Sequence, residues 1–185
     1  MRWFVDLGSD NYNMPSYFGS QRWTYFRLNN RSHNTLVIDD RLQEAPKEPC
    51  LITGSGEKEG ERWLEIDLGP AYKKQASKVI RRAIFDEGDG RVEMEDELTK
   101  PVGPVRWAVV TDAKVTIEGR SVTLEKGGRR LVVKRKDGSG GDWVVKDATP
   151  PSAQEKQNEG FRVVSFTAPK NDRVRLQVEW ALVNK

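Results

Sequence analysis

The sequence has few of the residues that form disulfides, bind metals or exchange protons at neutral pH. Its 185 residues include one cysteine, Cys50, and one histidine, His33. A single cysteine excludes an intrachain disulfide and leaves the cellular compartment open. Histidine is the only residue type whose ordinary pKa lies near neutrality, but a lone histidine is more often structural than catalytic, so the residues alone leave the role of His33 open.

Long apolar runs and a leader sequence are also missing. No stretch approaches the length of a membrane-spanning helix, so we expect no membrane partner. The opening residues 1–6 read directly as a strand and not as a signal peptide. A chain that opens within a strand is expected to be a fragment, with the true N-terminus and any export signal upstream.

An excess of charge of one sign is absent as well. Charged residues make up 32% of the chain, yet the net charge is only +3, which is typical of a solvated surface with interspersed signs. The acidic run 86–97 and the basic run 126–136 fit exposed hairpins. The basic run lacks interleaved aromatic residues, and no nucleic-acid-binding motif is present, so we expect no nucleic-acid partner.

The dominant pattern is alternation of apolar and polar residues with a period of two, which is typical of strands. Many short strands separated by turns predict an all-β fold, an antiparallel two-sheet β-sandwich that is jelly-roll-like and has little helix. Without an internal repeat or a visible boundary, residues 1–185 are expected to form a single domain. The predicted strands are residues 1–6, 22–28, 35–38, 62–68, 79–85, 91–98, 105–111, 113–117, 121–124, 130–134, 142–146, 161–168 and 173–183.

Local signals predict the connections. The pair Asp89-Gly90 predicts a hairpin turn, because glycine tolerates positive φ. Residues 136–141 and the polar, proline-containing residues 149–158 are expected to be loops, the second at the surface. Only residues 70–78 are predicted to hold a short helix.

The first 43 residues differ from the rest, because they hold three of the four tyrosines and the only histidine. Aromatic rings and arginines together suit an acidic carbohydrate, since arginine pairs bidentately with carboxylates or sulfates. The alternative is that the aromatic residues are half-buried rim residues. In a strand 22–28, alternation places Trp23, Tyr25, Arg27 and Asn29 on one face, and Arg22, Thr24, Phe26 and Leu28 on the other.

One segment resembles a known family. The run Ser32-His33-Asn34-Thr35-Leu36-Val37-Ile38-Asp39 is similar to the histidine-asparagine-threonine segment of the heparinase II/III-like polysaccharide lyases. The stretch 6–12, the pair Tyr17-Phe18, and Arg22-Trp23 with Tyr25 and Arg27 strengthen the resemblance in order and spacing. It covers most of the chain and is most specific in the first 43 residues.

Members of this family join an N-terminal α/α toroid to a C-terminal β-sheet domain and cleave uronic-acid-containing polysaccharides by β-elimination. The resemblance implies that this chain is the C-terminal domain without its toroid, that it lines the substrate cleft, and that it is inactive in isolation. The implied partners are an acidic polysaccharide and the toroid, in a periplasmic or secreted protein. The implied catalytic residue is His33, and the candidate substrate-binding residues are Arg22, Trp23, Tyr25, Arg27, Asn34, Tyr12 and Tyr17.

Some relatives hold a structural zinc in this domain, and the histidine of this segment is a candidate ligand there. A structural zinc normally takes four protein ligands, and this chain has no second histidine. We therefore predict no zinc and no other cofactor, with an ion bound through oxygens as the alternative. Two other functions stay open: a non-catalytic carbohydrate-binding module, and a structural sandwich in which His33 belongs to a hydrogen-bond network.

Overall fold

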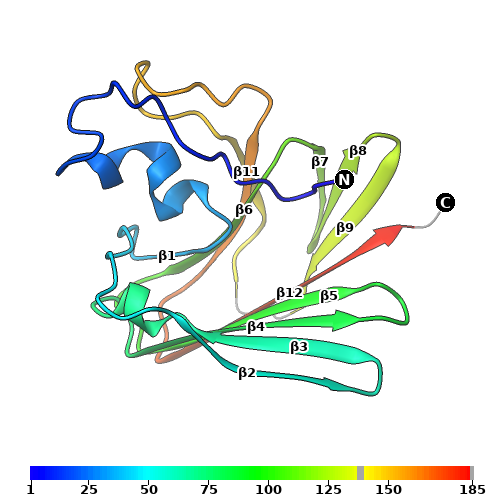
Figure 1. The fold of residues 1–185 in the computed structure, drawn as a ribbon. Coiled ribbons are helices and arrows are strands. Elements are labelled where there is room, and N and C mark those ends of the chain that lie inside the picture. Colours follow the sequence, from blue (N-terminus) through cyan, green and yellow to red (C-terminus); the bar gives the residue numbers. More distant parts are fainter. Residues whose placement is uncertain (137–139, 184–185) are drawn as a thin grey trace.

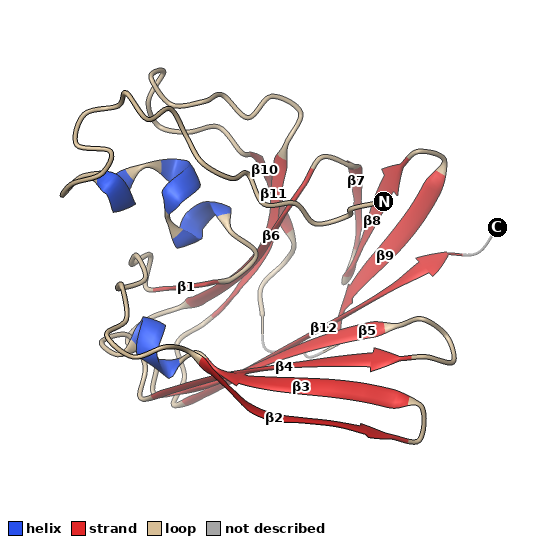
Figure 2. Ribbon diagram, in the orientation of Figure 1, coloured by secondary structure: helices blue, strands red, loops and turns tan. Residues whose placement is uncertain are grey.

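The computed structural model describes residues 1–136 and 140–183. Figures 1 and 2 show two antiparallel sheets, with order β1-β6-β11-β10 in the four-stranded sheet and β2-β3-β4-β5-β12-β9-β8-β7 in the eight-stranded sheet. The predicted all-β, two-sheet fold with little helix is confirmed. The strands are β1 Leu36–Ile38, β2 Leu51–Lys58, β3 Glu61–Asp67, β4 Lys78–Asp86, β5 Val92–Thr99, β6 Val105–Thr111, β7 Lys114–Glu118, β8 Ser121–Lys126, β9 Arg129–Arg135, β10 Val144–Asp147, β11 Arg162–Ala168 and β12 Arg173–Val183.

Two hydrophobic cores lie on opposite faces of the four-stranded sheet. The main core, between the sheets, contains Trp107 and Phe166 from the small sheet and Leu98 from the large one. The second core contains Ala108 on the other face, together with Leu7 of the N-terminal segment. Successive residues of a strand point to opposite faces, so Trp107 and Ala108 belong to different cores. The second core therefore fastens the N-terminal segment to the outer face of the small sheet.

Figure 1 shows the blue N-terminal segment beside the orange loop that follows β10. Several hydrogen bonds join them, among them one from the Lys156 amide to Asp10 Oδ1 at 2.9 Å and one from Arg27 Nε to Asn158 Oδ1 at 2.8 Å. Residues 149–158 form a loop, as predicted, but Glu155 and Asn158 within it are buried. The N-terminal segment and the loop after β10, which are far apart in the sequence, therefore pack against each other on the same side of the small sheet.

The hairpin predicted at Asp89-Gly90 is confirmed between β4 and β5. Gly90 adopts a φ of 70°, and its amide donates to Asp86 O at 3.0 Å. The helix predicted at residues 70–78 is shorter than expected, since only the 3-10 helix η4, Gly69–Tyr72, forms there. The loop predicted at residues 136–141 lies partly outside the described residues.

Two predicted strands at the N-terminus are wrong. Residues 1–6 are irregular, although the Val5 amide donates to Val110 O at 2.9 Å. Residues 22–28 form the 3-10 helices η1, Arg22–Thr24, and η2, Phe26–Leu28, which precede η3, Asn30–Ser32. The predicted division of these residues between two strand faces therefore fails.

Side-chain hydrogen bonds to the backbone explain why residues 22–28 turn. Asn29 Nδ2 donates to Tyr25 O at 2.8 Å, Ser32 Oγ to Phe26 O at 2.6 Å, and Thr24 Oγ1 to Gln21 O at 2.7 Å. Short polar side chains compete in this way with sheet hydrogen bonds. The carbonyl oxygens that accept these bonds are no longer available for the ladder of hydrogen bonds that an extended strand would need.

Candidate functional site

An open concavity of about 300 Å³ lies between the N-terminal segment and the turns η1 and η2. It brings together residues that are separated by up to 27 positions in the sequence. Its lining residues are Asp6, Gly8, Ser9, Tyr12, Tyr17, Phe18, Arg22, Trp23, Arg27, Leu28 and His33.

Aromatic rings form one wall of this concavity. Tyr12 is 60% exposed, Phe18 76% and Trp23 50%, whereas Tyr17 is buried. The ring of Tyr17 lies 5.0 Å from that of Tyr12 and 4.9 Å from that of Phe18. The buried Tyr17 thus supports exposed rings that present flat apolar faces to solvent.

The guanidinium of Arg22 lies among these rings. Its Cζ is 5.0 Å from the centroid of Tyr17, 5.8 Å from Phe18 and 5.1 Å from Trp23. Nη1 donates to Tyr17 O at 3.3 Å, and no carboxylate of the described residues forms an ion pair with it. Cation–π contacts hold the charge in place without neutralising it, so Arg22 remains able to pair with an anion.

Arg27 lines the same concavity, but its donors are occupied. Nε and Nη2 both donate to Asn158 Oδ1, at 2.8 and 2.5 Å, and Nη1 donates to Leu7 O at 2.7 Å and to Ser9 O at 3.2 Å. The side chain therefore clamps the N-terminal segment to the loop after β10. Its contribution to the site is to hold the wall in place.

His33 and Asp6 form a pair at the edge of the concavity. His33 Nδ1 lies 2.8 Å from Asp6 Oδ2, and the His33 side chain is 33% exposed. Burial raises the pKa of Asp6, but hydrogen bonds from the Gly8 amide and from His33, together with the His33 charge, outweigh it. The pKa of Asp6 consequently lies below its ordinary value of 3.8.

Asn34 fixes the backbone next to His33. Its Nδ2 donates to Val5 O at 3.2 Å, and its Oδ1 accepts the Val110 amide at 2.8 Å. The side chain thus bridges the irregular N-terminal segment and β6, and it satisfies one backbone group of each.

A buried polar network supports the same segment from the main core. Tyr72 Oη lies 3.1 Å from Thr35 Oγ1 and donates to Leu36 O at 2.8 Å. Arg81 Nη1 donates to Asn34 O at 3.1 Å, while its Nε and Nη2 bind the buried Asp96. The residues around His33 are therefore anchored by several different elements.

The structure brings most of the predicted site residues together. His33, Arg22, Trp23, Arg27, Tyr12 and Tyr17 all line the concavity, whereas Asn34 and Tyr25 do not. The Tyr25 ring stacks on Tyr17 with centroids 6.3 Å apart, and its hydroxyl donates to Pro15 O at 2.5 Å. The sequence reasoning did not assign site roles to Asp6 and Phe18, which also line the concavity.

The residues around His33 do not fit a structural zinc. No group of three or more His, Cys, Asp or Glu side chains is placed to hold a metal ion anywhere in residues 1–136 and 140–183. Among the described residues, Asp6 is the acidic side chain within hydrogen-bonding distance of His33, and this pair falls short of four ligands. The absence of a cofactor stays a prediction.

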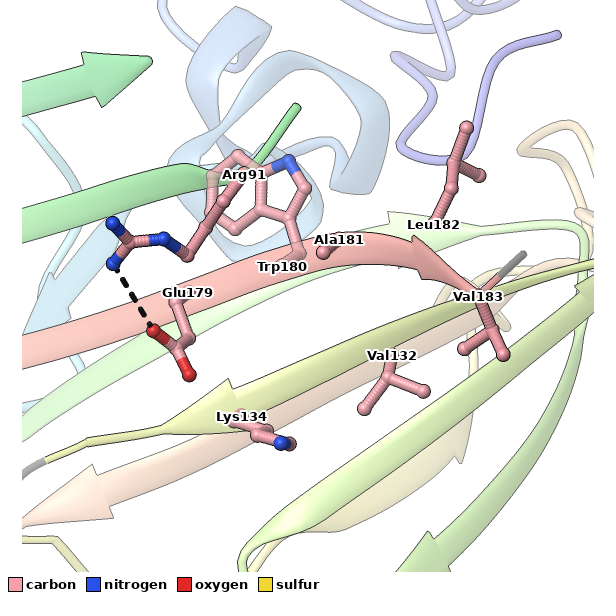
Figure 3. Close-up of a pocket in the computed structure, with 8 residues that line it drawn as sticks. All are labelled: Arg91, Val132, Lys134, Glu179, Trp180, Ala181, Leu182 and Val183. Atoms are coloured by element: carbon pink, nitrogen blue, oxygen red, sulfur yellow. Dashed lines mark ion pairs between the residues drawn. The ribbon is translucent and has the colours of Figure 1, made fainter. Parts of the chain in front are cut away.

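A second concavity, of about 250 Å³, lies at the end of β12 and is drawn in Figure 3. Arg91 reaches Glu179 across its floor at 3.6 Å, beside the alkyl side chains of Val132, Ala181 and Val183. Arg91 also lies near further carboxylates, including Asp86 at 3.1 Å. Its charge is thus already balanced by protein carboxylates, unlike that of Arg22.

The fold and this surface define a β-sandwich domain whose N-terminal segment carries an aromatic and cationic concavity. The model of the family "Heparinase II/III-like, C-terminal" matches residues 1–179. The chain belongs to this family, which confirms the resemblance. No helix in the described residues is long and apolar enough to span a membrane.

Solved structures support the fold at low sequence identity. A structure titled heparinase III matches 99% of this chain with a TM-score of 0.74 and 16% identity, over 28% of its own chain. A second heparinase III structure matches 98% with a TM-score of 0.70 and 12% identity, over 27% of its chain. The heparan sulfate lyase from Pedobacter heparinus matches 86% with a TM-score of 0.67 and 12% identity, over 25% of its chain.

The chain thus spans about 28% of the length of the first of these structures. At such identities the likeness concerns the fold alone. No curated protein sequence matches the chain.

Proposed function

We propose that this chain is the β-sheet domain of a polysaccharide lyase and lines the cleft that binds an acidic, uronic-acid-containing polysaccharide. The observation that carries the proposal is the guanidinium of Arg22, which forms no ion pair within the described residues and lies among three aromatic rings, in one concavity that also holds His33. Rings provide stacking surfaces for sugars, and a guanidinium provides a partner for a carboxylate or sulfate.

The same residue types suit β-elimination. Removing the proton at C5 of a uronate builds negative charge on the adjacent carboxylate, and a nearby cation such as Arg22 stabilises that charge. The leaving oxygen needs a proton, and a histidine titrates in the range where proton transfer is efficient. His33 would then transfer a proton or support the developing charge, while Trp23 and Tyr12 hold the sugar ring.

We further propose that the domain acts together with an N-terminal α/α toroid in a periplasmic or secreted protein, and that it has negligible lyase activity alone. Family membership and the small share of the heparinase III chains that it matches support this view. Ligand-binding sites occur preferentially at the interfaces between domains.

Binding tests the substrate class with this chain as it stands. We expect heparan sulfate, chondroitin sulfate or alginate to bind in calorimetry or affinity electrophoresis, and neutral dextran not to bind. Arg22→Ala and Trp23→Ala should each weaken binding, whereas Arg175→Ala, on an exposed face of β12, should not. Equal binding by wild type and Arg22→Ala would contradict the assignment of the site.

Turnover tests the reaction. Unsaturated uronate products absorb in the ultraviolet, so β-elimination can be followed directly. The domain alone should give no steady rise in absorbance, and the complete protein should give one that His33→Ala removes without lowering the melting temperature. A steady rise with the purified domain would contradict its proposed dependence on the toroid.

A non-catalytic carbohydrate-binding module is the second candidate, because the exposed rings of Tyr12, Phe18 and Trp23 offer stacking surfaces for sugars that do not involve His33. Undiminished turnover in the His33→Ala complete protein, with lost polysaccharide affinity in Trp23→Ala, would favour this function.

A further inference from the structure

The carboxylate of Asp6 is fixed by the residues on both sides of it. Before it, Val5 donates its amide to Val110 O at 2.9 Å and accepts from Asn34 Nδ2 at 3.2 Å. After it, the Gly8 amide donates to Asp6 Oδ1 at 2.7 Å, in a turn where Gly8 has a φ of 68°. One carboxylate oxygen is thus held by the backbone, and the other, Oδ2, faces His33 Nδ1 at 2.8 Å.

We propose that Asp6 is a positioning residue for His33, which keeps a proton on Nδ1 and leaves Nε2 as the atom that exchanges a proton with a bound sugar. The inference rests on the proposed function, because a fixed tautomer has a catalytic consequence only if His33 transfers protons.

The chemistry of the two groups sets the tautomer. An ionised carboxylate can only accept hydrogen bonds, so the imidazole nitrogen facing it must be a donor. The lowered pKa of Asp6 keeps the carboxylate ionised at neutral pH. A neutral His33 therefore carries its lone pair on Nε2, whereas a free histidine side chain favours the proton on Nε2.

The proton balance follows from this arrangement. When His33 acts as the base, Nε2 takes the proton from C5 of the uronate and the ring becomes an imidazolium, while the Nδ1 proton stays in the bond to Asp6. When His33 then acts as the acid, Nε2 gives that proton to the leaving oxygen. Asp6 remains ionised throughout. A carboxylate that orients a histidine and stabilises its charged form acts in this way without becoming protonated itself.

The other charged and titratable groups of the concavity do not compete for Nδ1. Arg22 is held by aromatic rings, and Arg27 donates to Leu7, Ser9 and Asn158. Tyr12 and Tyr17 contact each other through their rings. Asp6 is the acidic side chain among the lining residues.

The single histidine makes the tautomer directly measurable in this chain. With ¹⁵N in the imidazole, long-range proton–nitrogen correlation spectra distinguish a protonated from an unprotonated ring nitrogen. At a pH where His33 is neutral, wild type should show a protonated Nδ1 and an unprotonated Nε2.

Asp6→Asn is the sharpest variant, because its Oδ1 can still accept the Gly8 amide while an NH₂ group replaces the oxygen that faces Nδ1. The expected result is reversal to the Nε2-protonated form. Asp6→Ala should give the same loss of the Nδ1 proton if the turn at Gly8 survives. Asp40→Asn is the matched control, since it removes the same charge from an exposed pair with Arg31 and should leave the tautomer unchanged. A protonated Nε2 in wild type, or an unchanged spectrum in Asp6→Asn, would overturn the proposal.

Turnover in the complete protein separates this inference from the proposed function. We expect Asp6→Asn to lower kcat by roughly 100-fold, the lower end of what general acid–base catalysis contributes, with little change in KM. If His33→Ala removes turnover but Asp6→Asn leaves kcat unchanged, positioning by Asp6 is wrong and the role of His33 stands. If His33→Ala has no effect on turnover, the proposed function fails, even where the spectra confirm the tautomer.

Discussion

Arg81 and Asp96 form a bidentate ion pair directly behind the segment that carries His33. Arg81 Nε lies 2.7 Å from Asp96 Oδ1, and Nη2 lies 3.0 Å from Oδ2. Asp96 is fully buried, and the remaining nitrogen of Arg81 reaches Asn34 O. Since Asn34 follows His33, the pair connects the β4–β5 hairpin to the candidate site.

Removing one partner of this pair should destabilise the protein strongly. Asp96→Ala leaves the Arg81 charge buried without compensation, which typically costs about 3–5 kcal/mol in the free energy of unfolding. Urea denaturation followed by fluorescence measures this change. Asp40→Asn is the control, because its pair with Arg31 is exposed and should contribute only about 0–1 kcal/mol, and asparagine tolerates the φ of 52° at this position. Equal stability of the two variants would contradict the role of the buried pair.

Tyr72 should make stability depend on alkaline pH. Burial is the largest influence and raises its pKa above the ordinary value of 10.0, despite the opposing hydrogen bond with Thr35. A raised pKa in the folded state means that the neutral hydroxyl is favoured. Its contribution is full below pH 10 and is lost as the pH rises through the folded-state pKa.

Tyr72→Phe should remove part of that alkaline dependence. It also removes the hydroxyl donor to Leu36 O, which typically costs about 0.5–1.5 kcal/mol, because Asn30 Nδ2 still donates to the same oxygen. Thermal unfolding from pH 8 to 11 compares wild type with Tyr72→Phe and with the exposed control Tyr12→Phe. An alkaline stability loss in Tyr72→Phe as steep as that of wild type would assign the dependence to other groups.

Asp6 should show the opposite dependence at acid pH. Its folded-state pKa is lowered, so its contribution to stability is present above pH 3.8 and is lost as the pH falls through the folded-state value. In wild type the side-chain carboxyl carbon of Asp6 should titrate below its ordinary range. In His33→Ala that midpoint should move upward, because one hydrogen bond and one positive charge are gone. An unchanged midpoint would mean that the two side chains are not coupled in solution.

Local patterns in the sequence predicted much of the sandwich. The alternation in residues 62–68 predicted the strand β3, and Asp89-Gly90 predicted the turn between β4 and β5. Both signals depend only on residues that are neighbours in the sequence. The strand β2 was missed, because Gly54 and Gly56 give it no strand signal. The Trp63 ring explains these glycines, since a Cβ at either one would lie 2.9 Å from it.

The site was predictable only as a set of residue types. The resemblance pointed to His33, and composition pointed to Arg22 and Trp23, which do share a concavity. The pairing of Asp6 with His33 spans 27 positions and depends on how Val5 meets β6, which no local pattern encodes. The turns at η1 and η2 likewise depend on the side chains of Asn29 and Ser32, which capture carbonyls that an extended strand would need.

The two arginines of the concavity should respond differently to substitution. Arg22 forms no ion pair with any carboxylate of the described residues, so Arg22→Ala should reduce affinity for an acidic polysaccharide while changing the melting temperature little. Arg27 joins Leu7 and Ser9 to Asn158, so Arg27→Ala should lower the melting temperature and speed hydrogen exchange in the N-terminal segment.

Arg27→Lys should not restore the wild-type behaviour, because a lysine cannot reproduce a planar fork that reaches three partners. Hydrogen exchange of residues 1–19, measured beside polysaccharide affinity for each variant, separates the two roles. If Arg27→Ala weakened binding with no change in exchange or melting temperature, Arg27 would be a substrate contact instead of a clamp. If Arg22→Ala unfolded the segment, its guanidinium would be structural, and the charge available to a substrate would have to come from another residue.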